Sequence, residues 1–144
     1  MADRQDRIER EIDIDAPAQT VFALVSEPGW WINEGTVVPH RLEIEGDITI
    51  VHDDVHGKFR LRTVRVDPPR YAAFRWLDRE QPADGEQATL VEFFVKDRDE
   101  GVTLRVVESG FSLLAVPEPE LVTRIADNAE GWETELAAAR KHLA

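Results

Sequence analysis

The chain has 144 residues, no cysteine and a net charge of −12. This length suits a single domain with an ordinary core, and the lack of cysteine excludes disulfides, thiolate catalysis and zinc–thiolate sites. The negative charge disfavours binding to nucleic acid or anionic lipid, and no apolar run is long enough to span a membrane. We therefore expect one domain over residues 1–144 in the cytoplasm, with neither nucleic acid nor membrane as a partner.

The first part of the chain predicts one strand followed by two short helices. Alternating isoleucine and charged side chains indicate a strand over residues 7–13. Asp15-Ala16-Pro17 is typical of a helix start, because Asp caps helices and Pro suits the first helical position. Pro28-Gly29 ends this helix, and residues 30–35 should form a second short helical turn that ends at Gly35.

Period-two patterns predict six further strands, which should complete a sheet of seven. Their ranges are 41–45, 48–52, 59–66, 71–77, 89–95 and 102–108. In the last three strands one phase is wholly apolar and should face the core: Ala72, Phe74, Trp76, Val91, Phe93, Val95, Val102, Leu104 and Val106. The other phase carries Arg75, Glu92 and Arg105 and should face water. Its apolar members suggest self-association, as a possible homodimer, through this outer face: Tyr71, Leu90, Phe94 and Val107.

Charge is spread unevenly over these strands. Residues 57–79 hold seven Lys or Arg side chains, whereas residues 43–54 hold five acidic side chains and no Lys or Arg. This pattern indicates cross-strand charge pairing, which is the commoner case, or alternatively an anion site on the basic strands.

A long amphipathic helix is predicted over residues 119–143. Its apolar stripe recurs at spacings of three and four: Leu121, Ile125, Ala129, Trp132, Leu136, Ala139 and Leu143. This stripe should pack against the apolar face of the sheet, and acidic residues such as Glu135 should lie mostly off it. Because Gly131 weakens a helix by about 1 kcal/mol relative to alanine, we expect a ring or a strand to pack closely against it.

Two parts of the sequence resemble a known family. The segment Ile-Glu-Arg-Glu-Ile-Asp-Ile-Asp-Ala-Pro-Ala-Gln-Thr-Val-Phe-Ala-Leu-Val (8–25) is similar to the first strand and helix of the START-like (SRPBCC) superfamily. That superfamily includes polyketide cyclases, plant allergens and lipid-transfer domains. Thr-Leu-Arg-Val-Val-Glu-Ser-Gly-Phe (103–111) and Gly-Trp (131–132) resemble the bacterial homologues of the C-terminal domain of heat-shock-protein-90 ATPase activators.

The resemblance implies an α+β helix-grip fold, in which a curved seven-stranded antiparallel sheet wraps around the long C-terminal helix. It also implies a cavity between the sheet, that helix and the two short N-terminal helices. Chaperone activation belongs to the eukaryotic proteins, which carry an extra N-terminal domain, so the resemblance does not extend that role to this chain.

The candidate ligand site is a set of mostly aromatic side chains that would line such a cavity. It comprises Trp30, Trp31, Asn33, His40, Phe59, Leu61, Phe74, Trp76, Phe111 and Trp132. His40 or Asn33 would anchor a polar group of the ligand, whereas the plainer interpretation is that the set forms an ordinary core. Because adjacent residues on a helix cannot both point inward, one of Trp30 and Trp31 should be exposed at a cavity mouth or an interface.

The sequence contains no glycine-rich phosphate loop, no serine nucleophile signature and no metalloprotease helix. The segment His52-Asp53-Asp54-Val55-His56 carries metal-ligating side chains, but it straddles a strand end and a turn, which favours a solvated acidic turn over a metal site. We therefore expect no cofactor, no metal and no catalytic residue.

Three functions are compatible with these observations. The first is a non-catalytic domain that binds an apolar small molecule. The second is a protein-interaction module, such as a chaperone accessory, which needs an exposed apolar patch. The third is a cyclase-like or hydrolase-like enzyme, which needs His40 or an acid in the cavity as its general base.

Overall fold

The computed structural model describes residues 7–77, 89–111 and 117–143. Its strands are β1 (Arg7–Ile14), β2 (Arg41–Glu45), β3 (Ile48–Asp53), β4 (Gly57–Asp67), β5 (Tyr71–Leu77), β6 (Thr89–Asp97) and β7 (Val102–Ser109). Its helices are α1 (Ala18–Val25) and α2 (Glu118–Leu143). The seven predicted strands, the first helix and the long helix are thus confirmed, with small differences at their ends.

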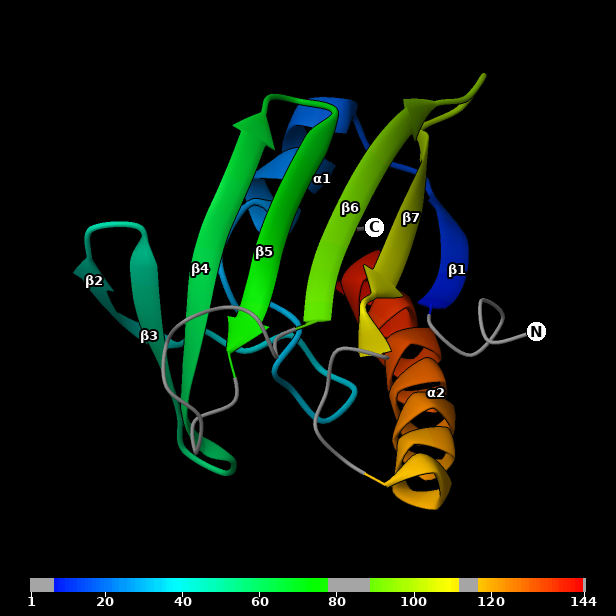
Figure 1. Cartoon of the computed structure of the whole chain (residues 1–144). Helices are drawn as coiled ribbons and strands as arrows, with labels where there is room; N and C mark the ends of the chain where they lie inside the picture. Colours follow the sequence, from blue (N-terminus) through cyan, green and yellow to red (C-terminus); the bar gives the residue numbers. More distant parts are fainter. Residues whose placement is uncertain (1–6, 78–88, 112–116, 144) are drawn as a thin grey trace.

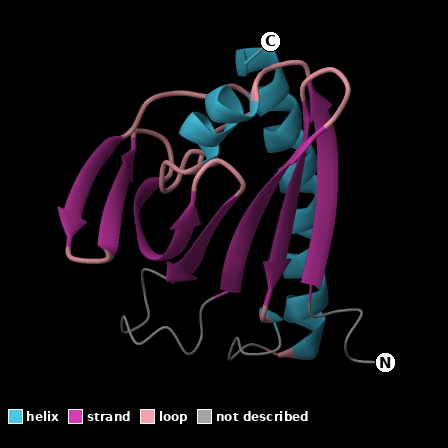
Figure 2. Cartoon of the chain, turned by 90° about the horizontal axis from the view of Figure 1, so that it is seen from above, coloured by secondary structure: helices cyan, strands magenta, loops and turns pink. Residues whose placement is uncertain are grey.

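The seven strands form one antiparallel sheet in the order β1-β7-β6-β5-β4-β3-β2 (Figure 1). From β2 to β7, strands that follow one another along the chain pair with each other, so this part of the sheet is built from sequential antiparallel neighbours. β1 completes the sheet by pairing with β7 over its whole length. Figure 2 shows the curvature of the sheet beside the long helix, which is the predicted α+β helix-grip arrangement.

The apolar phase of β5, β6 and β7 faces the core, as predicted. Eight of its nine members are buried: Ala72, Phe74, Val91, Phe93, Val95, Val102, Leu104 and Val106. Only Trp76 is partly exposed. Because a fully buried Val, Leu or Phe side chain contributes about 1.5–3 kcal/mol, this face is a main source of the fold's stability.

The opposite phase differs from the prediction at three positions. These buried residues are Ala73, Leu77 and Val107. Ala73 lies opposite Arg65 and Glu92 in the sheet register, and Val107 also lies opposite Glu92. Long charged side chains cover small apolar neighbours with their methylene groups, which explains this burial without a second layer of structure.

The segment after α1 forms turns, so the predicted second short helix is wrong. Gly29 adopts φ +78°, and a Cβ atom there would lie 2.7 Å from Cγ2 of Val51. The N–H of Trp30 donates to the carbonyl of Glu27, three residues back, as in a tight turn. Because the two tryptophans do not sit on a helix, both point inward, and the prediction that one is exposed is also wrong: Trp30 is 0% and Trp31 5% exposed.

The predicted stripe of α2 packs against the core. Trp132, Leu136 and Ala139 are buried. The rest of the stripe is partly buried against the same cluster: Leu121, Ile125, Ala129 and Leu143. Glu135 differs from the expectation, because it is also buried, at 7% exposure. No helix in the described ranges is long and apolar enough to cross a membrane.

Some of the basic side chains on and beside β4 form ion pairs with acidic side chains, as cross-strand charge pairing predicts. Arg62 of β4 lies 3.2 Å from Asp47, in the turn between β2 and β3. Arg70, in the turn between β4 and β5, donates two hydrogen bonds of 2.9 Å to Asp97 at the end of β6. These contacts are exposed to solvent, so each contributes little to the stability of the fold.

Candidate functional site

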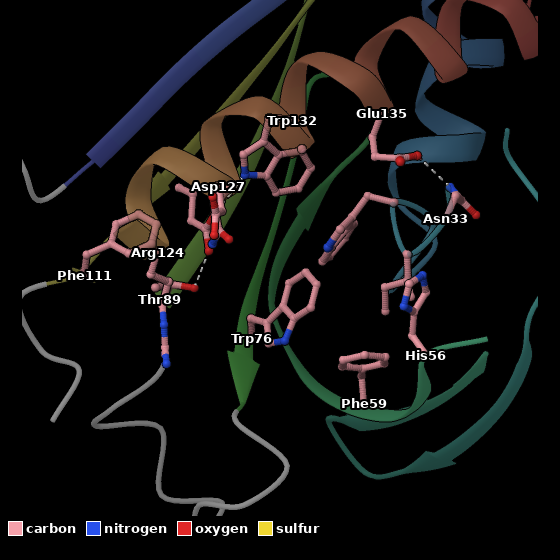
Figure 3. Close-up of a pocket in the computed structure, with 15 residues that line it drawn as sticks. Asn33, His56, Phe59, Trp76, Thr89, Phe111, Arg124, Asp127, Trp132 and Glu135 are labelled. Carbon is pink, nitrogen blue, oxygen red and sulfur yellow. Dashed lines mark hydrogen bonds between the residues drawn. The ribbon is translucent and has the colours of Figure 1, made fainter. Parts of the chain in front are cut away.

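A pocket of about 530 Å³ lies between α2, the sheet and the turns that follow α1 (Figure 3). Its described lining comes from three regions of the chain. The lining residues are Trp31, Ile32, Asn33, His56, Phe59, Trp76, Thr89, Glu108, Phe111, Arg124, Asp127, Asn128, Gly131, Trp132 and Glu135. The α2 residues among them recur at spacings of three and four, so one face of the helix forms one wall.

Aromatic rings make up much of the wall. The ring centroid of Trp31 lies 5.4 Å from that of Trp76 and 5.6 Å from that of Trp132. Phe59 meets Trp76 edge to face at 5.7 Å. These separations are those of favourable aromatic pairs. The buried indole N–H of Trp31 has no hydrogen-bond partner within the described ranges, so a lining residue retains an unused donor.

Glu108 is a carboxyl group on the inner face of β7, only 3% exposed. Its Oε2 atom accepts a 2.7 Å hydrogen bond from the Thr89 hydroxyl. Its Oε1 atom accepts bonds from Nε1 of Trp132 at 2.8 Å and from Nδ2 of Asn128 at 3.3 Å. Burial raises the pKa of Glu108, while the three hydrogen bonds oppose that rise.

Glu135 supplies a second buried carboxyl group. Its Oε1 accepts a 3.2 Å bond from Nδ2 of Asn33, and its Oε2 accepts one of 3.2 Å from the N–H of Gly35. Burial raises the pKa of Glu135, and the two bonds and the nearby His56 oppose the rise. Figure 3 shows Trp76 and Trp132 between Thr89 at one end of the pocket and the Asn33–Glu135 pair at the other.

The structure brings six of the ten predicted site residues to the pocket. They are Trp31, Asn33, Phe59, Trp76, Phe111 and Trp132. Trp30, Leu61 and Phe74 are instead fully buried in the core. Asn33 does not present a free amide, because that group already bonds the Trp30 carbonyl at 2.6 Å and Glu135.

His40 lies outside the pocket lining, in a buried pair with Asp53. Its Nε2 atom is 2.9 Å from Oδ1 of Asp53 and 2.7 Å from the carbonyl oxygen of Ile32. Burial raises the pKa of Asp53, but bonds from the N–H groups of His56 and Val55 and from His40 outweigh it, so the pKa is held below its usual value. His40 and Asp53 thus connect the β3–β4 turn, through hydrogen bonds, to Ile32 in the turns after α1.

The histidine-rich segment does not converge on one point. His52 contacts Glu43 across the β2–β3 pair, whereas Asp53 binds His40. His56 turns toward the pocket. In the described parts of the chain, no group of three or more potential ligands could hold a metal ion.

Glu108, Glu135 and Gly131 were missed as pocket residues, although the sequence carried a signal for one of them. Glu108 continues the inward phase of Val102, Leu104 and Val106, so period two alone places its carboxyl group inside. Glu135 had no such signal, because its burial depends on the turn at Asn33.

Comparison with known proteins agrees with this geometry. A model of the family described as activator of Hsp90 ATPase homolog 1-like protein matches residues 15–143. The chain belongs to this family. No match was found among curated proteins.

Solved structures share the fold of this family member at low sequence identity. Protein MLL2253 from Mesorhizobium loti is 17% identical with a TM-score of 0.68, over 94% of each chain. The Aha1 dimer from Colwellia psychrerythraea is 13% identical with a TM-score of 0.67, over 95% of each chain. The polyketide-cyclase-like protein Cgl2372 from Corynebacterium glutamicum is 17% identical with a TM-score of 0.62, over 95% of this chain and 90% of that one.

Proposed function

We propose that this domain binds a small, largely apolar molecule in the pocket without converting it chemically. The observation that carries the proposal is a cavity of about 530 Å³ walled by five aromatic side chains. Ligand sites are typically concave, mostly apolar and of this size, with a few placed polar groups. Cytoplasmic location and a single domain over the whole chain are part of the same proposal.

Gly131 provides the test, because it lies in the pocket wall and a Cβ atom added to it would meet nothing within 4 Å. The expected close packing against this glycine is therefore wrong: the missing side chain leaves open space. Replacing Gly131 by leucine should fill that space and weaken binding of a neutral probe such as N-phenyl-1-naphthylamine at least tenfold, measured by fluorescence titration. Gly131→Ala should raise the free energy of unfolding by about 0.5–1 kcal/mol.

The matched control is Ala126→Leu, which adds similar bulk to the exposed side of the same helix. It should leave probe affinity unchanged. A wild-type protein that binds no member of a broad panel of lipophilic probes, neutral or charged, would refute the proposal.

Catalysis in the same pocket is the second candidate, and the buried Glu108 favours it. A general base or acid must lie in the cavity and titrate near the working pH. Glu108 lines the cavity, and burial raises its pKa above the usual value for a glutamate. His40 does not line the pocket, so it would not be that base. Mass spectrometry of a bound ligand before and after incubation separates the two functions.

We further propose a homodimer through the outer face of the sheet. Support comes from Tyr71 and Phe94, whose rings pack 5.1 Å apart on that face, and from the dimeric state named for the Colwellia protein. Light scattering should give the mass of a dimer, and Phe94→Glu should give that of a monomer. A wild-type monomer at high concentration would contradict this.

A further inference from the structure

Within the described residues, the most buried acid of the pocket has no charged partner among its hydrogen-bond donors. Thr89, Asn128 and Trp132 are all neutral groups, and each donates to the Glu108 carboxyl group. A desolvated carboxylate is costly unless a cation or several donors compensate it. A purely apolar ligand would not reduce this cost, since it offers neither a cation nor a donor.

The carboxyl group of Glu108 has room for one more partner. Its two oxygens offer about four acceptor positions in total, of which the described residues use three. Among these residues, two donate to the Oε1 atom, whereas Thr89 alone donates to the Oε2 atom. The unused position is therefore on Oε2, in a residue that lines the cavity.

Aromatic rings lie beside this carboxyl group. Trp132 donates to it, so the indole edge is 2.8 Å away, and the ring of Trp132 is in contact with that of Trp31. Ammonium groups bind favourably over tryptophan rings, especially where water is excluded. A carboxylate set among tryptophans is the usual chemistry of an organic cation site.

The other charged lining residues do not cancel this preference. Glu135 is a second buried acid, and Asp127 is an exposed one. Arg124 is paired with Glu120 at 3.3 Å on the helix surface, and its side chain is 37% exposed. His56 is exposed in the β3–β4 turn. The buried part of the lining is thus acidic, and its basic groups lie toward the outside.

We infer that the ligand of this pocket is an organic cation: an apolar or aromatic molecule with a protonated nitrogen that pairs with Glu108. The inference rests on the proposed function, because it requires that the pocket holds a small molecule. It adds the chemical class of that molecule. The nitrogen donates to Oε2 of Glu108, and the apolar body lies along the wall formed by Trp31, Trp76 and Trp132.

The test uses three probes with one skeleton, a naphthalene whose two-carbon chain ends in an ammonium, a hydroxyl or a carboxylate group. Isothermal titration calorimetry of the full chain at pH 7 and 150 mM salt should show the ammonium probe binding at least tenfold more tightly than the alcohol, and the carboxylate probe most weakly. In Glu108→Gln this ammonium-to-alcohol ratio should fall close to one. The glutamine is a suitable replacement because its amide can accept from Trp132 and donate to Thr89.

Glu11→Gln is the matched control, since it removes the same charge from the exposed outer side of β1. It should keep the wild-type ratio. An equal fall in both variants would overturn the inference, because it would assign the preference to the overall negative charge. A wild-type ratio near one, or tighter binding of the carboxylate probe, would also overturn it while leaving the proposed function intact.

Failure of all three probes, together with failure of the lipophilic probe panel, would refute the proposed function itself. If the role of Glu108 were solely structural, Glu108→Gln would lower the free energy of unfolding but leave the ammonium-to-alcohol affinity ratio unchanged, which would overturn the inference. If that variant does not fold, the wild-type ratio and the Glu11→Gln control still decide the outcome.

Discussion

Replacing Trp30 by alanine should lower the free energy of unfolding by about 3–5 kcal/mol, the cost of deleting a large buried aromatic side chain. Trp30 is fully buried, and its ring packs against those of Phe93 at 5.5 Å and Trp31 at 6.3 Å. The cavity left behind would be bounded by these rigid rings, which limits relaxation. Urea unfolding followed by circular dichroism would show a lower midpoint with an unchanged slope.

Trp76→Ala is the informative comparison, because Trp76 is partly exposed and lines the pocket. It should cost less stability than Trp30→Ala and weaken probe binding more, when binding is measured on folded protein. Equal effects of the two variants on both quantities would contradict the assignment of Trp30 to the core and Trp76 to the pocket.

The second large effect is expected at Asp53. Its carboxylate accepts from His40 and from two backbone N–H groups in a nearly buried position, 6% exposed. Asp53→Ala should lower the free energy of unfolding by roughly 1–3 kcal/mol, since it leaves the buried His40 ring without its carboxylate partner and removes two exposed bonds in the turn. Asp54→Ala, at the exposed neighbouring residue, should change it by less than about 0.5 kcal/mol.

The contribution of Asp53 should depend on pH in a defined direction. Its pKa is lower in the folded than in the unfolded protein, so its stabilisation is present above the unfolded value of about 4 and is lost as the pH falls through the folded value. The raised pKa values of Glu108 and Glu135 act in the opposite direction. The difference in stability between the wild type and Asp53→Asn isolates the Asp53 contribution, and it should shrink below about pH 4. A difference that grows on acidification would contradict this.

Periodicity predicted the strands and the long helix because each has a single buried face that repeats along the chain. It failed at Trp30 and Trp31, where the backbone has no repeat. There, Gly29 with positive φ turns the chain so that neighbouring side chains both reach the core. No spacing rule describes such a turn, which depends on contacts made with β3 and β6.

The polar part of the pocket was harder to predict than its aromatic part. Aromatic residues are easily assigned to an interior, so five of the predicted aromatic site residues do line the cavity. The predicted polar anchor was His40 or Asn33, yet His40 lies outside the lining, bound to Asp53, and the Asn33 amide is already bonded to Glu135. The actual buried acids lie on opposite elements, β7 and α2, and their burial becomes evident only once the register of the sheet and the packing of the helix are known.

Trp31 belongs to two packing environments at once. Its ring contacts Phe74 and Phe93 of the core as well as Trp76 and Trp132 of the pocket. An occupant that pushed this wall outward would strain the core, so larger ligands would have to extend toward one of the exposed lining residues, His56 or Asp127, at the two ends of the pocket (Figure 3). An occupant that fits would instead raise the melting temperature, because binding to the folded state alone shifts the unfolding equilibrium. Thermal-shift screening is therefore a direct way to measure how large a molecule this domain tolerates.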